Sequence, residues 1–396
     1  MPGIKELILE KSSDLKEEVI RLRRHFHSNP ELSYEETGTA AYICEWLEKN
    51  NIGYKNRIAG TGIIGKITGN TGGGKVIAVR AEMDALPISE RKKTEYSSLN
   101  PGKMHACGHD AHMAMLMGVT KLLNEIRDQF GGTVILIFQP GEEKSPGGAR
   151  LVIESGELNN PKPDIIIAQH ILPELETGKV GYKAGRHMAS CDEIYITVKG
   201  KGGHAALPAL YTDQIYIASN LIVRLKDRMK ARQTAHQIPT VLGIGRISGE
   251  GATNVIPEKV NISGTFRTFD EKWRSEGLDL VRTVSSETAI DFGVNIDVNI
   301  VEGYPVLVND DNLTSRAIKF SEELLGVNRV ETYNNRMSSD DFSFYSALAP
   351  SLYYRIGIRK KNTEMLKLHT PDFDIDENGL ETGIANLSWL IYNFLL

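Results

Sequence analysis

The chain of 396 residues is longer than one hydrophobic core usually supports, which predicts about two domains. Its hydrophobic content of 41%, charged content of 24% and net charge of −5 are typical of a soluble globular protein and give no reason to expect nucleic acid as a partner. Three cysteines are too few for an extracellular disulfide framework, no apolar signal segment opens the chain, and no apolar run is long enough to cross a membrane, so we expect a cytoplasmic protein.

The first part of the chain has the pattern of an α/β sheet covered by helices. Its strand-like runs are apolar on both alternating faces, which is typical of strands buried on both sides. Apolar side chains recur at helical spacing from Leu15 to Phe26 and from Met115 to Ile126. In chain order we expect helices at 15–26 and 36–50, strands at 62–69 and 75–87, a helix that ends at Gly131, and strands at 133–143 and 163–170.

A second, half-exposed domain is predicted from about residue 188, where the strands begin to alternate apolar and polar side chains. The order of patterns is β-α-β-β-α-β, the split unit of ferredoxin-like domains. We therefore predict an α+β domain at 187–302, inserted into an α/β domain formed by 1–186 and 303–396. The expected elements of the inserted domain are strands at 193–200, 240–249, 258–269 and 293–303 and helices at 212–230 and 271–291. A helix at 311–325, a strand at 351–357 and a helix at 377–394 then complete the first domain.

Side chains that bind metals follow three of the buried strands. Glu82 and Asp84 come after "VIAVRA", Glu142 and Glu143 after "VILIFQPG", and His170 after "DIIIAQ". Open α/β sheets build their sites at the carboxyl ends of the strands, so these residues are expected to meet at one edge. The sequence therefore predicts a site at this edge.

The stretch "HACGHDAH" at 105–112 supplies further ligands of the same chemistry. It holds Cys107 and His109, with His105 and His112 on either side, and His369 lies far downstream in "KLHTPDFDIDE". Thiolates, neutral imidazoles and carboxylates are the ligands of zinc and its first-row neighbours. The predicted set is too large for one catalytic zinc with an open position and suggests two ions: Cys107, His109, Glu143, His170 and His369.

Three alternatives remain open on the residues alone. His105 and His112 are each either direct participants or ordinary buried histidines. The chain is either an enzyme or a non-catalytic protein with a structural metal that binds peptides or acyl amino acids, although structural zinc sites usually contain paired cysteines. A hydrolase that uses the Cys107 thiol as nucleophile is the third alternative.

Eight motifs, in order along nearly the whole chain, resemble those of the N-acyl-amino-acid amidohydrolases, the metallopeptidase relatives that include aminoacylases, hippurate hydrolases and indole-acetyl-amino-acid hydrolases. They include "RAEMDALP", "MHACGHDAHMAMLMG", "FQPGEE", "VKGKGGHAALP" and "HTPDFDIDE". The resemblance implies a catalytic domain with two divalent ions, such as zinc, manganese, cobalt or nickel, and an inserted lid domain that forms a homodimer.

Site residues are carried over from the resemblance position by position. Cys107, His109, Glu143, His170 and His369 match metal ligands, with Cys107 bridging. Glu142 matches the general base that takes a proton from the metal-activated water, and Asp84 matches an acid that orients a ligand. In the lid, His204 matches a residue that steadies the oxyanion in a partner subunit's site, and Asn254 and Arg267 match residues that hold the substrate carboxylate or the intermediate.

The chain departs from the usual pattern at four positions. Glu82 replaces a common aspartate, Gly141 an alanine, Ala209 a histidine and Gln214 a proline, and the last two leave substrate choice open. The predicted function is hydrolysis of the amide bond of N-acyl-L-amino acids, small molecules of unspecified acyl group and amino acid. The alternative is carboxypeptidase or dipeptidase action on short peptides with the same site.

Overall fold

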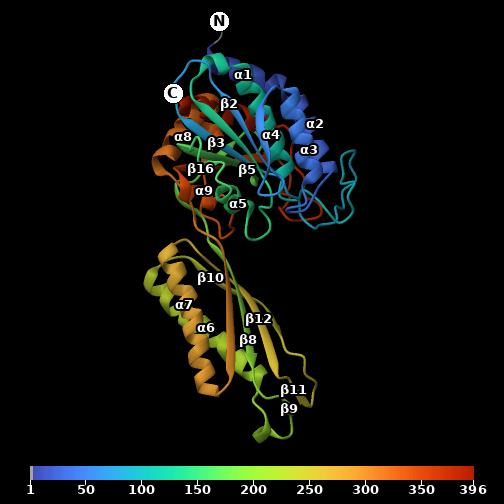
Figure 1. Ribbon diagram of the computed structural model, residues 1–396, viewed down its shortest axis with the longest axis vertical. Coiled ribbons are helices and arrows are strands. Elements are labelled where there is room, and N and C mark those ends of the chain that lie inside the picture. Colours follow the sequence, from blue (N-terminus) through green and yellow to red (C-terminus); the bar gives the residue numbers. More distant parts are fainter. Residues whose placement is uncertain (1–2) are drawn as a thin grey trace. The chain divides into compact units, whose positions relative to one another are not determined.

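The computed structural model describes residues 3–396, apart from the side chains of residues 235 and 236, and the chain divides into two compact units. The first comprises the chain up to Gly185 together with Val308–Asn334 and Asp341–Leu396. The second comprises Arg186–Leu307 and Asn335–Asp340, so the predicted insertion at 187–302 lies inside it. The short excursion at 335–340 was not predicted. Figure 1 shows the elements of both units.

A mixed eight-stranded sheet forms the centre of the first unit. Its strand order is β1-β2-β4-β3-β5-β16-β6-β15. β3, β4, β5 and β16 run parallel to their neighbours in this group, whereas β1 with β2, β2 with β4, and β16 with β6 are antiparallel. The strands are β1 (Gly53–Ile58), β2 (Gly62–Thr68), β3 (Val76–Glu82), β4 (Thr133–Gln139), β5 (Ile165–Glu176), β6 (Val180–Tyr182), β15 (Val330–Thr332) and β16 (Ser351–Arg359).

The central strands are buried on both faces, as their uninterrupted apolar sequences predicted. In β3, Ile77 and Val79 enter the main hydrophobic core, while Ala78 and Arg80 point to the opposite face and are also buried. The mixed α/β fold class is therefore confirmed. An arginine in such a strand is unusual, since a buried charge is costly unless it is paired.

Helices complete the core of the first unit. α2, α4 and α10 contact one another, and α4 and α10 both contact β3. The helices are α1 (Ile4–Asp14), α2 (Lys16–Ser28), α3 (Thr37–Lys49), α4 (His109–Glu125), α5 (Gly148–Glu154), α8 (Asp311–Leu325), α9 (Ser343–Leu348) and α10 (Gly379–Leu395), with short 3₁₀ turns at Arg127–Gln129 and Val327–Arg329. Among the described residues, no helix is long and apolar enough to cross a membrane.

The second unit has the predicted β-α-β-β-α-β order. Its four-stranded antiparallel sheet has the order β10-β12-β8-β13, and α6 and α7 pack on one face of it (Figure 1). Burial alternates along β8 because only one face carries the core. The elements are β8 (Cys191–Lys199), β9 (Gly203–His204), a 3₁₀ turn (Pro208–Leu210), α6 (Gln214–His236), β10 (Thr240–Ser248), β11 (Val255–Ile256), β12 (Lys259–Thr268), α7 (Glu271–Phe292) and β13 (Asn295–Tyr304).

Some elements differ from the sequence-based expectations. β5 continues to Glu176, so His170 lies within a strand and not at its end as predicted. The pairing of β5 with β3 nevertheless ends at Ala168 of β5, which pairs with Arg80 of β3. His170 therefore lies two residues beyond the end of this pairing. The short elements α1, β1, α5 and α9 were not predicted, and β7 (Gly185–Met188) and β14 (Leu307–Asn309) lie where the chain passes between the units.

Candidate metal centre

The turn before α4 brings Cys107 and His109 into position. Gly108 between them has φ +84°, the left-handed region, and a Cβ on it would lie 2.3 Å from Cδ1 of Ile171. Both the backbone conformation and the close contact therefore require glycine. The turn packs directly against β5, the strand that carries His170.

The five predicted ligands lie together. Donor atoms of Cys107, Glu143 and His369 lie within 4.8 Å of one another. Sγ of Cys107 is 3.6 Å from Nε2 of His170, and Nε2 of His369 is 3.1 Å from Oε1 of Glu143. His109 joins Glu142 and Glu143 in a second group of the same kind. Segments from four distant parts of the sequence thus converge on one small volume.

Two of the imidazoles are held so that Nε2 is left for a ligand. Nδ1 of His109 is 2.8 Å from the carbonyl oxygen of Asp84 and 3.3 Å from its Oδ1, and Nδ1 of His170 is 2.8 Å from the carbonyl oxygen of Ile171. Each Nδ1 therefore carries the proton and donates it. Nε2 of His109 is buried and has no hydrogen-bond partner among the described residues. Such orientation by an oxygen partner is typical of metal-binding histidines.

Asp84 connects His109 to the loop with the paired glutamates. Its Oδ2 accepts hydrogen bonds from the backbone N–H of Glu143 at 2.9 Å and from the hydroxyl of Ser33 at 2.7 Å. Burial opposes the charge on this carboxyl, but the hydrogen bonds and the charge of His109 outweigh it and lower the pKa of Asp84. An ionised Asp84 can thus fix one histidine and one glutamate at once.

The electrostatics of the group favour a bound cation. Burial, followed by the charges of Glu143 and Glu142, raises the pKa of the Cys107 thiol well above its usual range. Burial lowers the pKa of His109, but Asp84 and Glu82 outweigh it and raise that pKa to about 10, so the carboxylates around this ring favour a positive charge. Burial lowers the pKa of His170, which keeps it neutral. Thiolate, imidazole and carboxylate donors with one orphaned imidazole nitrogen fit a zinc-like divalent ion.

The raised pKa of Cys107 also bears on the thiol-hydrolase alternative. A nucleophilic cysteine needs a lowered pKa and an electropositive surrounding. Cys107 is buried among carboxylates instead. The geometry therefore favours Cys107 as a metal ligand over Cys107 as a nucleophile.

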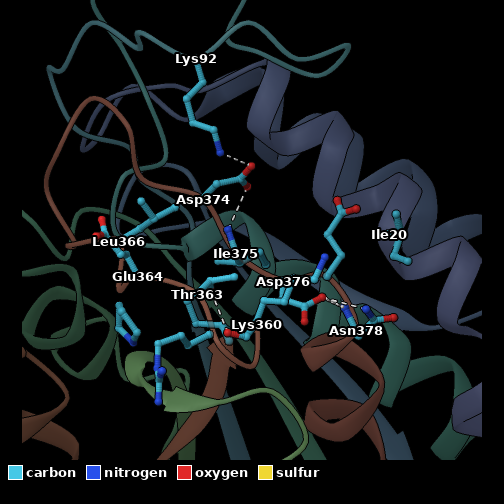
Figure 2. Close-up of a pocket in the computed structure, with 14 residues that line it drawn as sticks. Ile20, Lys92, Lys360, Thr363, Glu364, Leu366, Asp374, Ile375, Asp376 and Asn378 are labelled. Carbon is cyan, nitrogen blue, oxygen red and sulfur yellow. Dashed lines mark hydrogen bonds and ion pairs between the residues drawn. The ribbon is translucent and has the colours of Figure 1, made fainter.

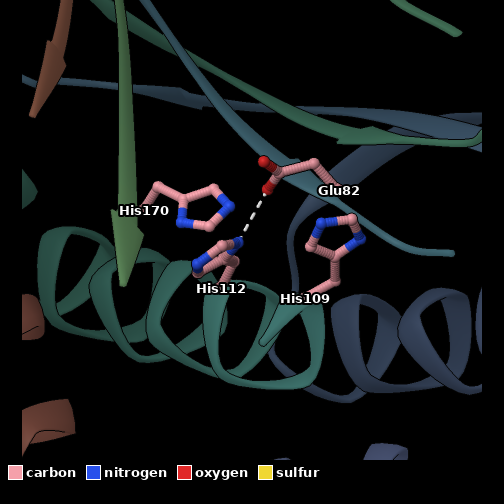
Figure 3. Close-up of side chains that lie close together, drawn as sticks. All are labelled: Glu82, His109, His112 and His170. Atoms are coloured by element: carbon pink, nitrogen blue, oxygen red, sulfur yellow. Dashed lines mark hydrogen bonds and ion pairs between the residues drawn. The ribbon is translucent and has the colours of Figure 1, made fainter. Parts of the chain in front are cut away.

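His112 lies in a third group of close donor atoms, with Glu82, His109 and His170 (Figure 3), but both of its nitrogens are occupied. Its Nε2 accepts a hydrogen bond of 3.0 Å from the backbone N–H of Ile171. Its Nδ1 must then carry the proton, which it donates to Oε2 of Glu82 at 2.9 Å. His112 is thus held neutral in one tautomer and has no lone pair left for an ion. His105, the other open candidate, is buried, and neither ring nitrogen has a hydrogen-bond partner among the described residues.

Sequence reasoning missed two residues near the centre, Arg80 and Asp341. Both are buried, and Nη2 of Arg80 donates to Oδ1 of Asp341 at 2.6 Å, while Nη1 pairs with Glu82. Asp341 also accepts hydrogen bonds from the side chain of Gln139 and from the backbone N–H of Ala149. The charge of Arg80 interrupting the apolar run "VIAVRA" was a signal for such a buried pair.

The remaining predicted residues lie in the second unit. His204 is exposed on β9, and its Nδ1 accepts a hydrogen bond of 3.1 Å from the backbone N–H of Ala206. Asn254 is close by, since its carbonyl oxygen accepts a hydrogen bond from the N–H of Ala205. Arg267, on β12, is half-buried and donates to the carbonyl oxygen of Met337 at 3.0 Å. The structure therefore groups His204 with Asn254.

Two of the departures from the family pattern have clear positions. Gln214 is fully buried at the start of α6 and packs against Gly200, so its side chain cannot contact a substrate directly. Ala209 is exposed in the 3₁₀ turn after His204. Of these two, only Ala209 can influence substrate choice by contact.

A cavity of about 560 Å³ lies elsewhere in the first unit (Figure 2). It is lined by Ile20 of α2, by Lys92, and by residues of the segments 358–366 and 374–378, among them Asp374. None of the predicted site residues lines it. Lys92 and Asp374 form an ion pair there, and because none of the candidate ligands lines the cavity, we assign the metal chemistry to the ligand cluster and not to this cavity.

Known proteins resemble this chain over almost its full length. A family model described as peptidase family M20/M25/M40 matches residues 78–393. The IAA-amino acid hydrolase ILR1-like 4 of Arabidopsis thaliana is 36% identical over 397 residues, covering 99% of this chain and 89% of that protein. The thermostable carboxypeptidase 2 of Saccharolobus solfataricus is 35% identical, covering 98% and 99%. The crystal structure of a dinuclear metal-binding M20 peptidase from Bacillus subtilis superposes with a TM-score of 0.83 at 32% identity, covering 97% and 99%.

Proposed function

The chain belongs to peptidase family M20/M25/M40, whose members hydrolyse amide or peptide bonds with divalent metals, and we propose that it cleaves the amide bond of N-acyl-L-amino acids with two ions per subunit. The observation that carries the proposal is the convergence of Cys107, Glu143 and His369 within 4.8 Å. A structural metal site has no need for a spare carboxylate, and Glu142 supplies one beside the ligands.

The proposed metal ligands are those that the resemblance indicated: Cys107, His109, Glu143, His170 and His369. When bound, divalent ions at such a site acidify water and polarise a carbonyl oxygen. Zinc, manganese, cobalt and nickel would all suit these donors, among them the sulfur of Cys107. Asp84 holds the Nδ1 proton of His109 and the backbone N–H of Glu143, which fixes two ligands.

Glu142 is the proposed general base. Its side chain is almost completely buried, and its Oε2 lies 3.9 Å from Nε2 of His109. We propose that this carboxylate takes a proton from the attacking water and later gives it to the leaving amine nitrogen. A positioned acid–base group of this kind typically contributes ~10²–10⁴-fold to the rate.

His204, Asn254 and Arg267 are the proposed substrate-binding groups of the second unit. Because Nδ1 of His204 accepts a hydrogen bond from Ala206, Nε2 carries the proton in the neutral ring and is available as a donor. We propose that this N–H steadies the oxyanion in the site of a partner subunit of a homodimer. Asn254 and Arg267 are proposed to hold the substrate carboxylate or the intermediate.

A second candidate function is carboxypeptidase or dipeptidase action on short peptides. It is supported by the similarity, over almost the full length of both chains, to the thermostable carboxypeptidase 2. The experiment that separates the two candidates is an activity screen of the metal-loaded protein across N-acyl amino acids and dipeptides, in which mass spectrometry detects the freed amine. Turnover of N-acyl amino acids at least tenfold above that of dipeptides supports the first candidate, and the reverse supports the second.

A further inference from the structure

Four buried side chains form a continuous chain of contacts that ends at the metal centre. Asp341 pairs with Arg80, Arg80 with Glu82, and Glu82 with His112. We call this chain, Asp341–Arg80–Glu82–His112, the buried relay. Each member is at most 1% exposed.

His112, the member of the buried relay nearest the proposed ligands, is hydrogen-bonded to the backbone of Ile171. Nε2 of His112 accepts the N–H of Ile171 at 3.0 Å. The carbonyl oxygen of the same residue accepts the Nδ1 proton of His170 at 2.8 Å. Ile171 therefore connects His112 to His170, and the two rings lie with their centroids 4.4 Å apart (Figure 3).

The other members of the buried relay, Glu82, Arg80 and Asp341, explain why His112 is held in a single tautomer. Glu82 accepts the Nδ1 proton of His112, and a carboxylate buried there requires a cationic partner, which Arg80 provides. Arg80 in turn is held by Asp341 and by Oε1 of Gln139 at 2.9 Å. Removing any member leaves a buried charge or donor unsatisfied.

We infer that His112 is a positioning residue, which the buried relay holds in one tautomer so that the Ile171 backbone fixes His170 toward the metal pair. This inference rests on the proposed ligand role of His170. It assigns to His112 and Arg80 a role distinct from that of a ligand. Loss of such supporting partners typically lowers metal affinity or activity ~10–100-fold.

The test compares three variants of the full-length protein by competition of Zn²⁺ with a chromophoric chelator. His112→Gln retains an amide oxygen that can accept the Ile171 N–H, whereas His112→Met has no acceptor. His25→Met is the matched control, because His25 lies on α2 in the same unit and stacks on Tyr42 away from the ligands. We expect the weaker of two Zn²⁺ affinities to fall ~10–100-fold in His112→Met, and to recover largely in His112→Gln.

Each outcome decides the inference. If His112 were itself a ligand, His112→Gln and His112→Met would lose affinity equally, which would overturn the positioning role. Unchanged affinity in His112→Met would overturn it as well. If His112→Met fails to fold by circular dichroism, His112→Gln is compared with His112→Asn, which can donate to Glu82 but is too short to reach Ile171, and we expect only the asparagine variant to lose affinity.

The readout is independent of the substrate. A parent protein that binds two Zn²⁺ ions but cleaves no N-acyl amino acid would contradict the proposed function and leave the buried relay intact. Conversely, a fully active parent whose His112→Met variant binds Zn²⁺ normally would contradict the relay alone.

Discussion

Nε2 of His369 lies 3.1 Å from Oε1 of Glu143, although the two residues are far apart along the chain. His369 follows the last strand of the sheet, and the N–H of His369 donates to the carbonyl oxygen of Ala106, next to Cys107. The fold therefore brings the loop after β16 to the turn before α4. The proposed metal centre depends on this contact, because no single segment carries the complete set of proposed ligands.

Replacement of Glu142 by glutamine separates catalysis from metal binding. The amide cannot accept a proton, so we expect kcat to fall ~10²–10⁴-fold. Metal content should stay at the parent value, since Glu142 is not a proposed ligand. Steady-state kinetics and elemental analysis of the same preparation measure both quantities. Unchanged turnover in a fully metal-loaded variant would show that Glu142 is not the base.

Removal of the metals should silence the enzyme reversibly. We expect chelation to abolish turnover and a divalent ion to restore it, whereas iodoacetamide should react slowly with Cys107 in the loaded protein because this residue is buried. At a free-ion concentration of 100 times the dissociation constant, binding stabilises the fold by about 2.7 kcal/mol, so melting should shift to a lower temperature in the chelated protein. Activity that survives chelation but not alkylation would favour the thiol-hydrolase alternative.

Mixed dimers test the proposed role of His204 in a partner's site. His204→Ala and Glu142→Gln homodimers should each be nearly inactive, because a lost oxyanion donor typically costs ~10²–10³ in rate. A refolded mixture should regain part of the parent activity, since some heterodimers contain one site with both groups intact. Mixing two independently prepared Glu142→Gln samples is the control. A mixture that stays as inactive as its components refutes action between subunits.

The Asp374–Arg23 pair predicts a pH-dependent contribution to stability. Burial opposes the charge on Asp374, but Arg23 and Lys92 outweigh it and lower the pKa of this carboxyl. A lowered folded-state pKa contributes stability above the unfolded value of about 3.9, and this contribution is lost as the pH falls through the folded-state pKa.

Asp374→Asn should accordingly lower the free energy of unfolding at pH 7 by ~1.5–3 kcal/mol, the usual value of a charged hydrogen bond. The difference from the parent should shrink below about pH 4, where Asp374 begins to be protonated in the unfolded chain while it is still ionised in the folded protein. Urea unfolding of both proteins between pH 3 and pH 7 measures the difference in their free energies of unfolding. A difference that stays constant over this range would contradict the assignment.

Much of the fold was predictable from periodicity. Strands such as β3 and β4 are apolar on both faces, and the alternating pattern of β8 indicated a sheet with one covered face. The resemblance to N-acyl-amino-acid amidohydrolases is confirmed by the family match. Short elements such as β1 and α5 were not predicted, because a segment of six or seven residues is too short to show a clear periodic pattern.

The details of the site were less predictable. The sequence left open whether His112 takes part directly, and only three-dimensional contacts reveal that Nε2 of His109 is unpaired and both nitrogens of His112 are occupied. Similarly, the sequence showed a charge at Arg80 but not its partner Asp341, which lies far away along the chain. Long-range pairing of polar side chains is a property of the folded state.

An anomalous difference map from crystals of the zinc-loaded protein tests the central claim most directly. The account predicts two peaks per chain, each within about 2.0–2.3 Å of side-chain donors drawn from Cys107, His109, Glu143, His170 and His369, with Sγ of Cys107 between them. A single closed four-coordinate peak, or peaks away from these five residues, would contradict it.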